Sequence, residues 1–149
     1  GQHLSYGYKL YWWPLPPVEP TQAQVEKTWS GMGNVPEGWI PGEQAPKNYA
    51  RRFAVDFVGE PLAGLAGDVP VQAHVDISRG TLGHVQVRRF EPIQGYRAIF
   101  DWSPDSESDE AVSIRLYLRS GDRPLTATWL YQWVPPRADE RHYEDSPEP

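Results

Sequence analysis

The clearest pattern in the chain is an alternation of apolar and polar side chains with a period of two. It is sharpest over residues 112–119, where aliphatic side chains occupy every second position and Ser, Arg and Tyr lie between them. This period is typical of a β-strand that buries one face. Similar stretches recur at 4–13, 53–57, 71–77, 85–87, 96–100 and 125–134. The pattern therefore predicts about seven strands.

Turn-forming residues separate these stretches at short intervals. They are Gly59-Glu60-Pro61, Arg79-Gly80, Gln94-Gly95 and Ser120-Gly121-Asp122. A length of 149 residues fits one domain, and 16 Pro with 13 Gly argue against long helices. Together these features predict an all-β fold, an antiparallel β-sandwich of two sheets. A small barrel is the alternative that the spacing leaves open.

Residues 14–50 interrupt the alternation. They hold seven of the 16 prolines, and only the stretch from Thr21 to Trp29 could form a short helical turn. Because the region also carries Met32, Trp39 and Ile40, we expect one long Pro-rich loop that folds back on the sandwich. Residues 137–149 hold five acids against two bases and predict a disordered acidic tail. The sandwich domain then covers residues 1–136.

A three-residue loop, Ser78-Arg79-Gly80, predicts a hairpin between the stretches at 71–77 and 85–87. In that register Val75 faces Gly83, and His74 lies opposite His84 on the outer face. Zinc needs three or four protein ligands, and the one carboxylate expected nearby is Asp76. We therefore interpret the two histidines as solvated or hydrogen-bonded imidazoles and predict no metal site.

The sequence offers little for catalysis. Half of its 20 acids fall in the turn at 101–110 and in the tail, where solvation is their ordinary state. Asp56 stands alone on a strand, which predicts a hydrogen bond or an ion pair with a basic neighbour at the sheet edge. No Ser/His/Asp order, phosphate-binding loop or zinc-helix motif is present in the sequence. We predict that the chain is not itself an enzyme and uses no cofactor.

The net charge of −6 argues against nucleic acid as a partner, because no Lys/Arg cluster is longer than a pair. No apolar run approaches the roughly 18 residues of a membrane span. The seven Trp are the remaining candidates for binding, since flat rings stack on sugars. Trp129 and Trp133 share the inward face of the last stretch and predict core positions. The candidate contacts for a glycan or a protein partner are Tyr11, Trp13, Trp29 and Trp39.

Several segments resemble the periplasmic glucan biosynthesis proteins of the OpgG/OpgD family, also called MdoG/MdoD. RFAVDFVG at 52–59 is similar to the family's "FVVDF-G" strand, and PLAGL at 61–65 resembles the segment that follows it. GYRAIF at 95–100 resembles a "GWR" strand, and YGYKL at 6–10 resembles the strand that begins the C-terminal domain. The most specific match is RPLTATWLYQ at 123–132, which is close to "LTETWSYQ" with Ala127 in place of the usual Glu.

The resemblance covers residues 4–134 and implies an immunoglobulin-like C-terminal domain of a periplasmic protein needed for osmoregulated periplasmic glucans, which are β-1,2-linked. Family members resemble inverting endo-β-1,2-glucanases or transglycosylases whose catalytic acids lie in a large N-terminal β-domain. None of those positions exists here, so no catalytic residue is carried over. We expect an accessory domain whose partners are that N-terminal domain and, further, glucan or the membrane glucan synthase. The alternatives are an independent carbohydrate-binding module and a protein–protein interaction domain.

Overall fold

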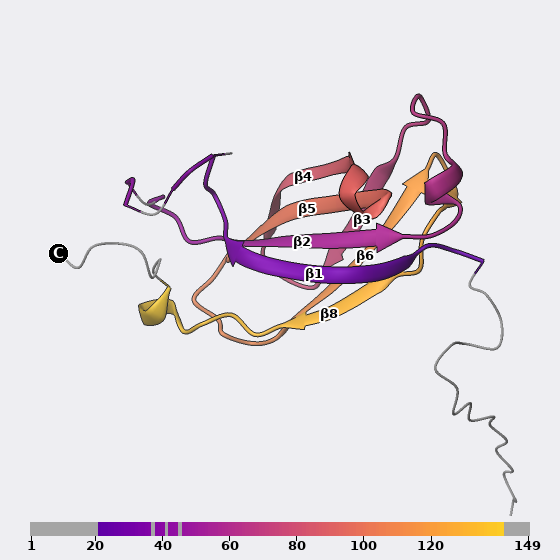
Figure 1. Ribbon diagram of the computed structural model, residues 1–149. Helices are drawn as coiled ribbons and strands as arrows, with labels where there is room; N and C mark the ends of the chain where they lie inside the picture. The colour runs from indigo at the N-terminus through magenta and orange to yellow at the C-terminus, as the bar shows by residue number, and fades with distance from the viewer. Residues whose placement is uncertain (1–20, 37, 41, 45, 142–149) are drawn as a thin grey trace, which may run out of the picture.

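The computed structural model describes residues 21–36, 38–40, 42–44 and 46–141, so the strand predicted at 4–13 lies outside it. Two antiparallel four-stranded sheets face each other, which confirms the β-sandwich (Figure 1). The strands are β1 Gln24–Met32, β2 Arg51–Val58, β3 Gln72–Ile77, β4 Thr81–Phe90, β5 Gly95–Ser103, β6 Val112–Ser120, β7 Arg123–Pro124 and β8 Trp129–Trp133. The helical segments of the described residues are short 3₁₀ turns, η1 Leu62–Gly64, η2 Glu91–Ile93 and η3 Ala138–Glu140.

The strand order is that of an immunoglobulin constant-type domain. One sheet runs β1-β2-β5-β4, and in the other β6 lies between β3 on one side and β7 and β8 on the other. These orders correspond to the A-B-E-D and C-F-G sheets of the immunoglobulin fold, with β7 and β8 sharing the place of strand G. The predicted immunoglobulin-like architecture is therefore confirmed at the level of topology.

The prediction of a helical turn over residues 21–29 is wrong, because β1 occupies this region and pairs along its length with β2. The predicted loop at 14–50 therefore contains an edge strand. Its alternation is concealed because a β-bulge shifts the register between Val25 and Lys27, and because Thr28 and Ser30, which pair with Val55 and Phe53, are polar and stay exposed at the sheet edge. Small polar residues on the core-facing side remove the apolar signal, whereas backbone pairing with β2 still specifies a strand.

The core forms between the inner faces of the two sheets. The alternation read from the sequence is confirmed in β2, β5 and β6, whose alternate side chains are buried. These side chains are Phe53, Val55, Phe57, Tyr96, Ala98, Phe100, Trp102, Val112, Ile114, Leu116 and Leu118. Burial of this apolar area is the main stabilising contribution to the fold.

The predicted hairpin between 71–77 and 85–87 is wrong. β3 pairs with β6, whereas β4 pairs with β5 in the other sheet. The Ser78-Arg79-Gly80 turn crosses between the sheets, and the Trp102 indole nitrogen donates to the Arg79 carbonyl oxygen at 2.8 Å. Apolar residues of β3 and β4 do face the same core, but from opposite sheets. His74 and His84 are therefore not opposite each other.

The predicted last strand at 125–134 is interrupted. β7 and β8 both pair with β6, and between them Ala23 forms a parallel bridge to Thr126. The Thr126 hydroxyl oxygen also accepts from the Leu118 backbone amide at 3.0 Å. Residues 125–128 therefore bond to both β6 and the segment before β1, which closes the sandwich on this side.

The start of the predicted disordered tail is ordered. η3 lies at 138–140, and the Arg141 guanidinium donates to the carbonyl oxygens of Pro136, Ser106 and Ser108. Two of these acceptors, Ser106 and Ser108, hold the arginine against the turn after β5. The rest of the tail, residues 142–149, lies outside the described residues.

Candidate binding surface

Trp29 lies on the outer face of the β1-β2-β5-β4 sheet, where 51% of its surface is exposed. The Lys27 ammonium lies 5.4 Å from the centre of its ring, a cation–π contact between two residues of one strand. Its indole nitrogen donates to Asp56 Oδ2 at 3.4 Å. The ring is therefore a surface aromatic held in place by charged neighbours.

Trp39 lies apart from Trp29, in the loop between β1 and β2. Its indole nitrogen donates to the Gln44 carbonyl oxygen at 3.4 Å, so the ring closes this loop on itself. In the described part of the chain no ring contact joins Trp29 to Trp39. Tyr11 and Trp13 lie outside the described residues, and their role stays a prediction.

Asp56 forms the ion pair that the sequence predicted, with Arg97 on the neighbouring strand β5. Nε and Nη2 of Arg97 donate to the two carboxylate oxygens at 2.7 and 2.9 Å. The pairing lies inside the sheet and not at its edge, because β2 is flanked by β1 and β5. The hydrogen bonds that Arg97 donates to Asp56 raise the pKa of Arg97, against the opposing effect of burial.

A second pair of the same kind joins Arg52 to Asp101 at 2.7 and 2.9 Å. The sequence interpretation missed it, although a signal was present. Arg52 precedes Asp56 by four positions, and Arg97 precedes Asp101 by four. When two strands with the same Arg-x-x-x-Asp spacing pair in antiparallel fashion, each Arg meets an Asp, as the β2–β5 register shows.

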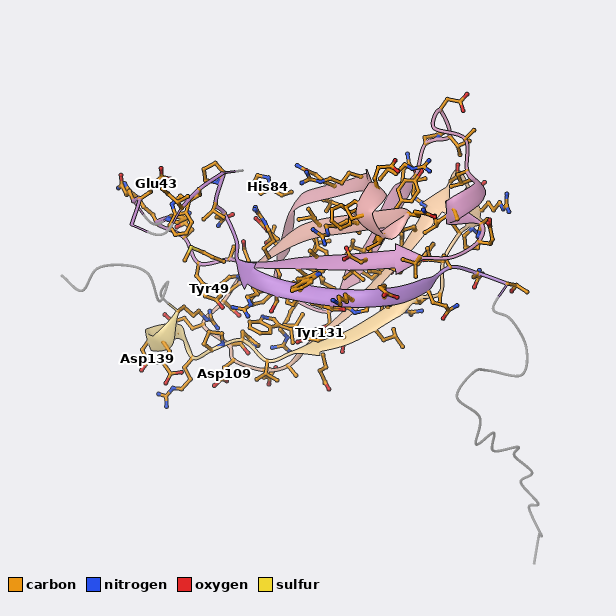
Figure 2. All side chains as sticks on the ribbon, in the orientation of Figure 1. Glu43, Tyr49, His84, Asp109, Tyr131 and Asp139 are labelled. Atoms are coloured by element: carbon orange, nitrogen blue, oxygen red, sulfur yellow. The ribbon has the colours of Figure 1, made fainter. Side chains whose placement is uncertain are left out.

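Aromatic rings of β2, β5 and β8 contact one another on the side of the sandwich where β1 and β8 run next to each other (Figure 1). Tyr131 is labelled on this side in Figure 2. Trp129 is buried, which confirms its predicted core position, and Tyr131 stacks on it with ring centres 5.1 Å apart. Tyr131 still exposes 38% of its surface because β8 is an edge strand. Leu130 and Val134 are more exposed still, at 69% and 63%. Tyr131 and Leu130 belong to β8 and point to its inner and outer side, and Val134 directly follows the strand. These three residues are called the β8 edge below.

Near the end of this aromatic side, Arg51 lies over the Trp133 ring at 5.3 Å. Trp133 is half-buried, and its indole nitrogen is a buried donor without a hydrogen-bond acceptor, as is Nε of Arg51. Tyr49, labelled in Figure 2, is near enough to Arg51 and Arg141 for their positive charges to act on its phenol. Burial raises the pKa of Tyr49, and the two arginines partly oppose that shift.

A pocket of about 130 Å³ opens on the outer face of the β1-β2-β5-β4 sheet. Its lining residues are Val35, Pro36, Arg52, His84, Gln86, Arg88 and Ile99. His84 lies on the same side of the molecule as the loop that carries Glu43 (Figure 2). The sequence interpretation placed His84 in a hairpin and therefore did not find this pocket.

His74, the other histidine of the expected pair, bonds to Asp76 at 3.0 Å and contacts Tyr117. Within the described ranges, no three His, Cys, Asp or Glu side chains gather as a metal site would require. The described residues also contain no helix with the length and apolar character needed to cross a bilayer.

A family model described as "Periplasmic glucan biosynthesis protein, MdoG" matches residues 1–133 of the chain. Glucans biosynthesis protein D of Pseudomonas syringae pv. tomato is 49% identical over 143 residues. The protein of the same name from Pseudomonas savastanoi pv. phaseolicola is 48% identical over 143 residues. Each alignment covers 96% of this chain but 26% of the relative, so the chain spans about a quarter of the relatives' length.

Proposed function

Because the chain belongs to the MdoG family of periplasmic glucan biosynthesis proteins, we propose that it acts as an accessory domain of such a protein. In this role it binds the rest of the parent polypeptide, and that part of the polypeptide catalyses the reaction on the glucan. In this proposal the chain itself has no catalytic activity and operates in the periplasm.

The observation that carries the proposal is that the chain forms a whole sandwich and yet matches about a quarter of each relative's length. The described residues contain both sheets of an immunoglobulin-like sandwich with a continuous buried core. The same chain accounts for 26% of each relative. A self-contained sandwich that forms a small part of a longer family member is what an accessory domain requires.

The β8 edge supplies the docking surface in this proposal. Leu130 and Tyr131 of the edge strand β8, and Val134 directly after it, expose apolar surface. Exposed apolar side chains that cluster on one element are typical of contact surfaces. A neighbouring domain of the same polypeptide is an occupant present at high effective concentration. The membrane glucan synthase is a further partner that such a domain could recruit.

A binding experiment tests this role. The chain is titrated into the separately produced remainder of the Pseudomonas syringae glucans biosynthesis protein D, and complex formation is followed by sedimentation. The double variant Leu130→Ser/Val134→Ser should weaken the complex. Val85→Ser is the matched control, because Val85 is 45% exposed on β4 in the other sheet. Absence of a complex, or equal weakening by both variants, contradicts the proposal.

A carbohydrate-binding module is the second candidate, favoured by the half-exposed Trp29 ring beside polar side chains. Aromatic faces are apolar platforms that suit the apolar side of a sugar ring. Lys27 lies over this ring, so a sugar that stacks on the same face must displace the ammonium group. Linear β-1,2-glucan should then change the indole fluorescence, and Trp29→Ala should abolish the change while Trp39→Ala leaves it intact. A flat titration of the unmodified chain eliminates this candidate.

A further inference from the structure

The edge strands of the sandwich differ in how their open sides are protected. β1 and β4 are each interrupted by a bulge, between Val25 and Lys27 in β1 and between Gly83 and Gln86 in β4. β3 carries the charged side chain of Asp76. Bulges and charged side chains on edge strands prevent pairing with further strands. β8 has neither, because its sequence WLYQW holds no charge or proline and its register with β6 is continuous.

The backbone of β6 shows which of its residues bond toward β8. The Leu118 carbonyl oxygen accepts from the Leu125 amide, and the Leu118 amide donates to the Thr126 hydroxyl. Ser113 bonds in the opposite direction, to Ser78 just after β3. Both backbone groups of a residue in an antiparallel strand point to one side, and that side alternates along the strand. Even-numbered residues of β6 therefore direct their backbone groups toward β7 and β8.

The same alternation decides which residues of β8 bond outward. Even-numbered residues of β6 pair with the odd-numbered residues of β8, which are Trp129, Tyr131 and Trp133. The backbone groups of Leu130 and Gln132 therefore point to the open side of β8. Among the described residues, the backbone hydrogen bonds outside the strand ladders do not include these groups. Leu130 and Gln132 each offer one donor and one acceptor at this edge.

Tyr131 shows that its own side of the edge is uncovered. The Tyr131 ring faces the core, where it contacts Phe53 and stacks on Trp129, yet 38% of its surface is exposed. Leu130, on the outer side of β8, is 69% exposed. A strand beside β8 would place alternate side chains next to Tyr131 and next to Leu130. The open side of β8 therefore suits an uncharged strand with apolar side chains.

We propose that β8 receives a strand from the rest of the parent polypeptide, which extends the sheet by β-strand addition. Backbone hydrogen bonds to Leu130 and Gln132 provide the affinity, and contacts with the side chains of Leu130 and Tyr131 provide the selectivity. The occupant is an extended, uncharged segment of the polypeptide outside this chain, which matches 26% of a relative's length. This inference rests on the docking role proposed above and specifies how the two parts join.

The test repeats the sedimentation titration with the remainder of the Pseudomonas syringae protein. Gln132→Pro removes an amide that points to the open side, and proline is tolerated at such a position of an edge strand. The variant should weaken the complex about tenfold, because a backbone hydrogen bond is lost and its acceptor stays unpaired. Gln132→Ala removes the same side chain but keeps the amide, so it should bind more tightly than Gln132→Pro.

Ala73→Pro is the matched control on the opposite edge of the same sheet. Ala73 pairs with Leu118, whose backbone groups point away from β3. The Ala73 amide therefore points to the open side of β3. Ala73→Pro should leave the affinity unchanged, and urea unfolding of each variant checks that it is folded. Equal weakening by Gln132→Pro and Ala73→Pro overturns the proposal, because it reveals a general effect of proline.

Amide exchange resolved by residue is a second readout that needs no substitution. In the free chain the amides of Leu130 and Gln132 should exchange faster than the Tyr131 amide, and the complex should protect both. Equal affinities of Gln132→Pro and Gln132→Ala overturn strand addition and leave docking intact. If Gln132→Pro does not fold, unchanged exchange of the two amides in the complex overturns strand addition instead. Absence of any complex overturns docking and strand addition together.

Discussion

Thr28 and Trp129 are 101 positions apart in the sequence, yet the Trp129 indole nitrogen donates to the Thr28 hydroxyl oxygen at 3.0 Å. This hydrogen bond joins β1 to β8, the two edge strands that run next to each other in Figure 1. It also gives the large buried indole its polar partner, which buried Trp side chains usually require.

Thr28→Val should therefore lower the free energy of unfolding by about 1 kcal/mol, the usual net value of one hydrogen bond. Urea unfolding followed by circular dichroism measures the change. In a Trp129→Phe background the same substitution should have almost no effect, because the donor is already gone. A full effect in that background would show that the bond is not the cause.

The two halves of this contact differ in how far the sequence predicts them. Trp129 lies in a strand whose inward face was evident from the alternation of residues 125–134. Thr28 lies in β1, which the sequence does not distinguish from a loop because a β-bulge follows Val25 and the next core-facing positions, Thr28 and Ser30, are polar. Edge strands are specified by backbone pairing with a neighbour, and that neighbour is distant in sequence. A period-two search therefore finds core strands more readily than strands of this kind.

The two ion pairs between β2 and β5 predict an asymmetry in mutational effects. Arg97→Met leaves the carboxylate of Asp56, which is 3% exposed, without its bidentate partner. It should destabilise the chain by about 3–5 kcal/mol, as loss of one member of a buried pair does. Asp56→Asn leaves an arginine that can turn toward water, and about 1–3 kcal/mol is expected.

The same order should hold for the second pair, with Arg52→Met more damaging than Asp101→Asn. Denaturant unfolding of the four variants measures it. Equal losses for the arginine and aspartate variants would contradict this account, in which the two carboxylates are buried more deeply than the two guanidinium groups. The exposed Arg115→Met serves as the control and should stay within about 0.5 kcal/mol of the unmodified chain.

Glycine at position 95 allows β5 to approach β2 closely. A Cβ atom added there would collide with the Phe57 carbonyl oxygen. Gly95→Ala should therefore destabilise the chain by at least about 1–3 kcal/mol, the usual effect of overpacking. Gly31→Ala in β1 is the control, because its Cβ would have no heavy atom within 4 Å. That variant should be neutral or stabilising by about 0.5–1 kcal/mol; similar losses at both positions would contradict the close approach.

Tyr49 predicts a pH dependence. Burial raises its pKa, so folding favours the protonated phenol over the phenolate. Its contribution to stability is fully present below the unfolded-state pKa of about 10 and is lost as the pH rises through the higher folded-state value. Unfolding free energies measured from pH 8 to 11 should therefore fall more steeply for the unmodified chain than for Tyr49→Phe. Parallel curves would show that the phenol is not responsible.

Other differences between sequence and structure have identifiable physical origins. The turn at 78–80 has the length of a hairpin loop, and strand parity is satisfied equally well when the two strands face one core from different sheets. The residues of the turn do not decide between these two arrangements. The decision comes from strands distant in the sequence, because β3 pairs with β6 and β4 pairs with β5. The Arg-x-x-x-Asp spacing, in contrast, is visible in the sequence of both β2 and β5. It is a signal that these two strands are neighbours in the sheet.

The same distinction applies to the candidate site. The sequence indicates Trp29 as a possible contact, and its ring lies on the surface of the structure. The pocket around Arg88 required knowledge that β4 pairs with β5 and that a bulge alters the direction of His84. Residues drawn from three strands and a loop cannot be grouped from spacing along the chain.

The central claim is that this sandwich is an accessory domain that docks through the β8 edge. Amide hydrogen exchange tests it most directly, on a full-length Pseudomonas syringae glucans biosynthesis protein D whose matching segment is replaced by this chain. The isolated chain is measured beside it. Docking predicts slower exchange in β8 within the full-length protein, and unchanged exchange in β4. Identical exchange of β8 in the two samples would contradict the claim.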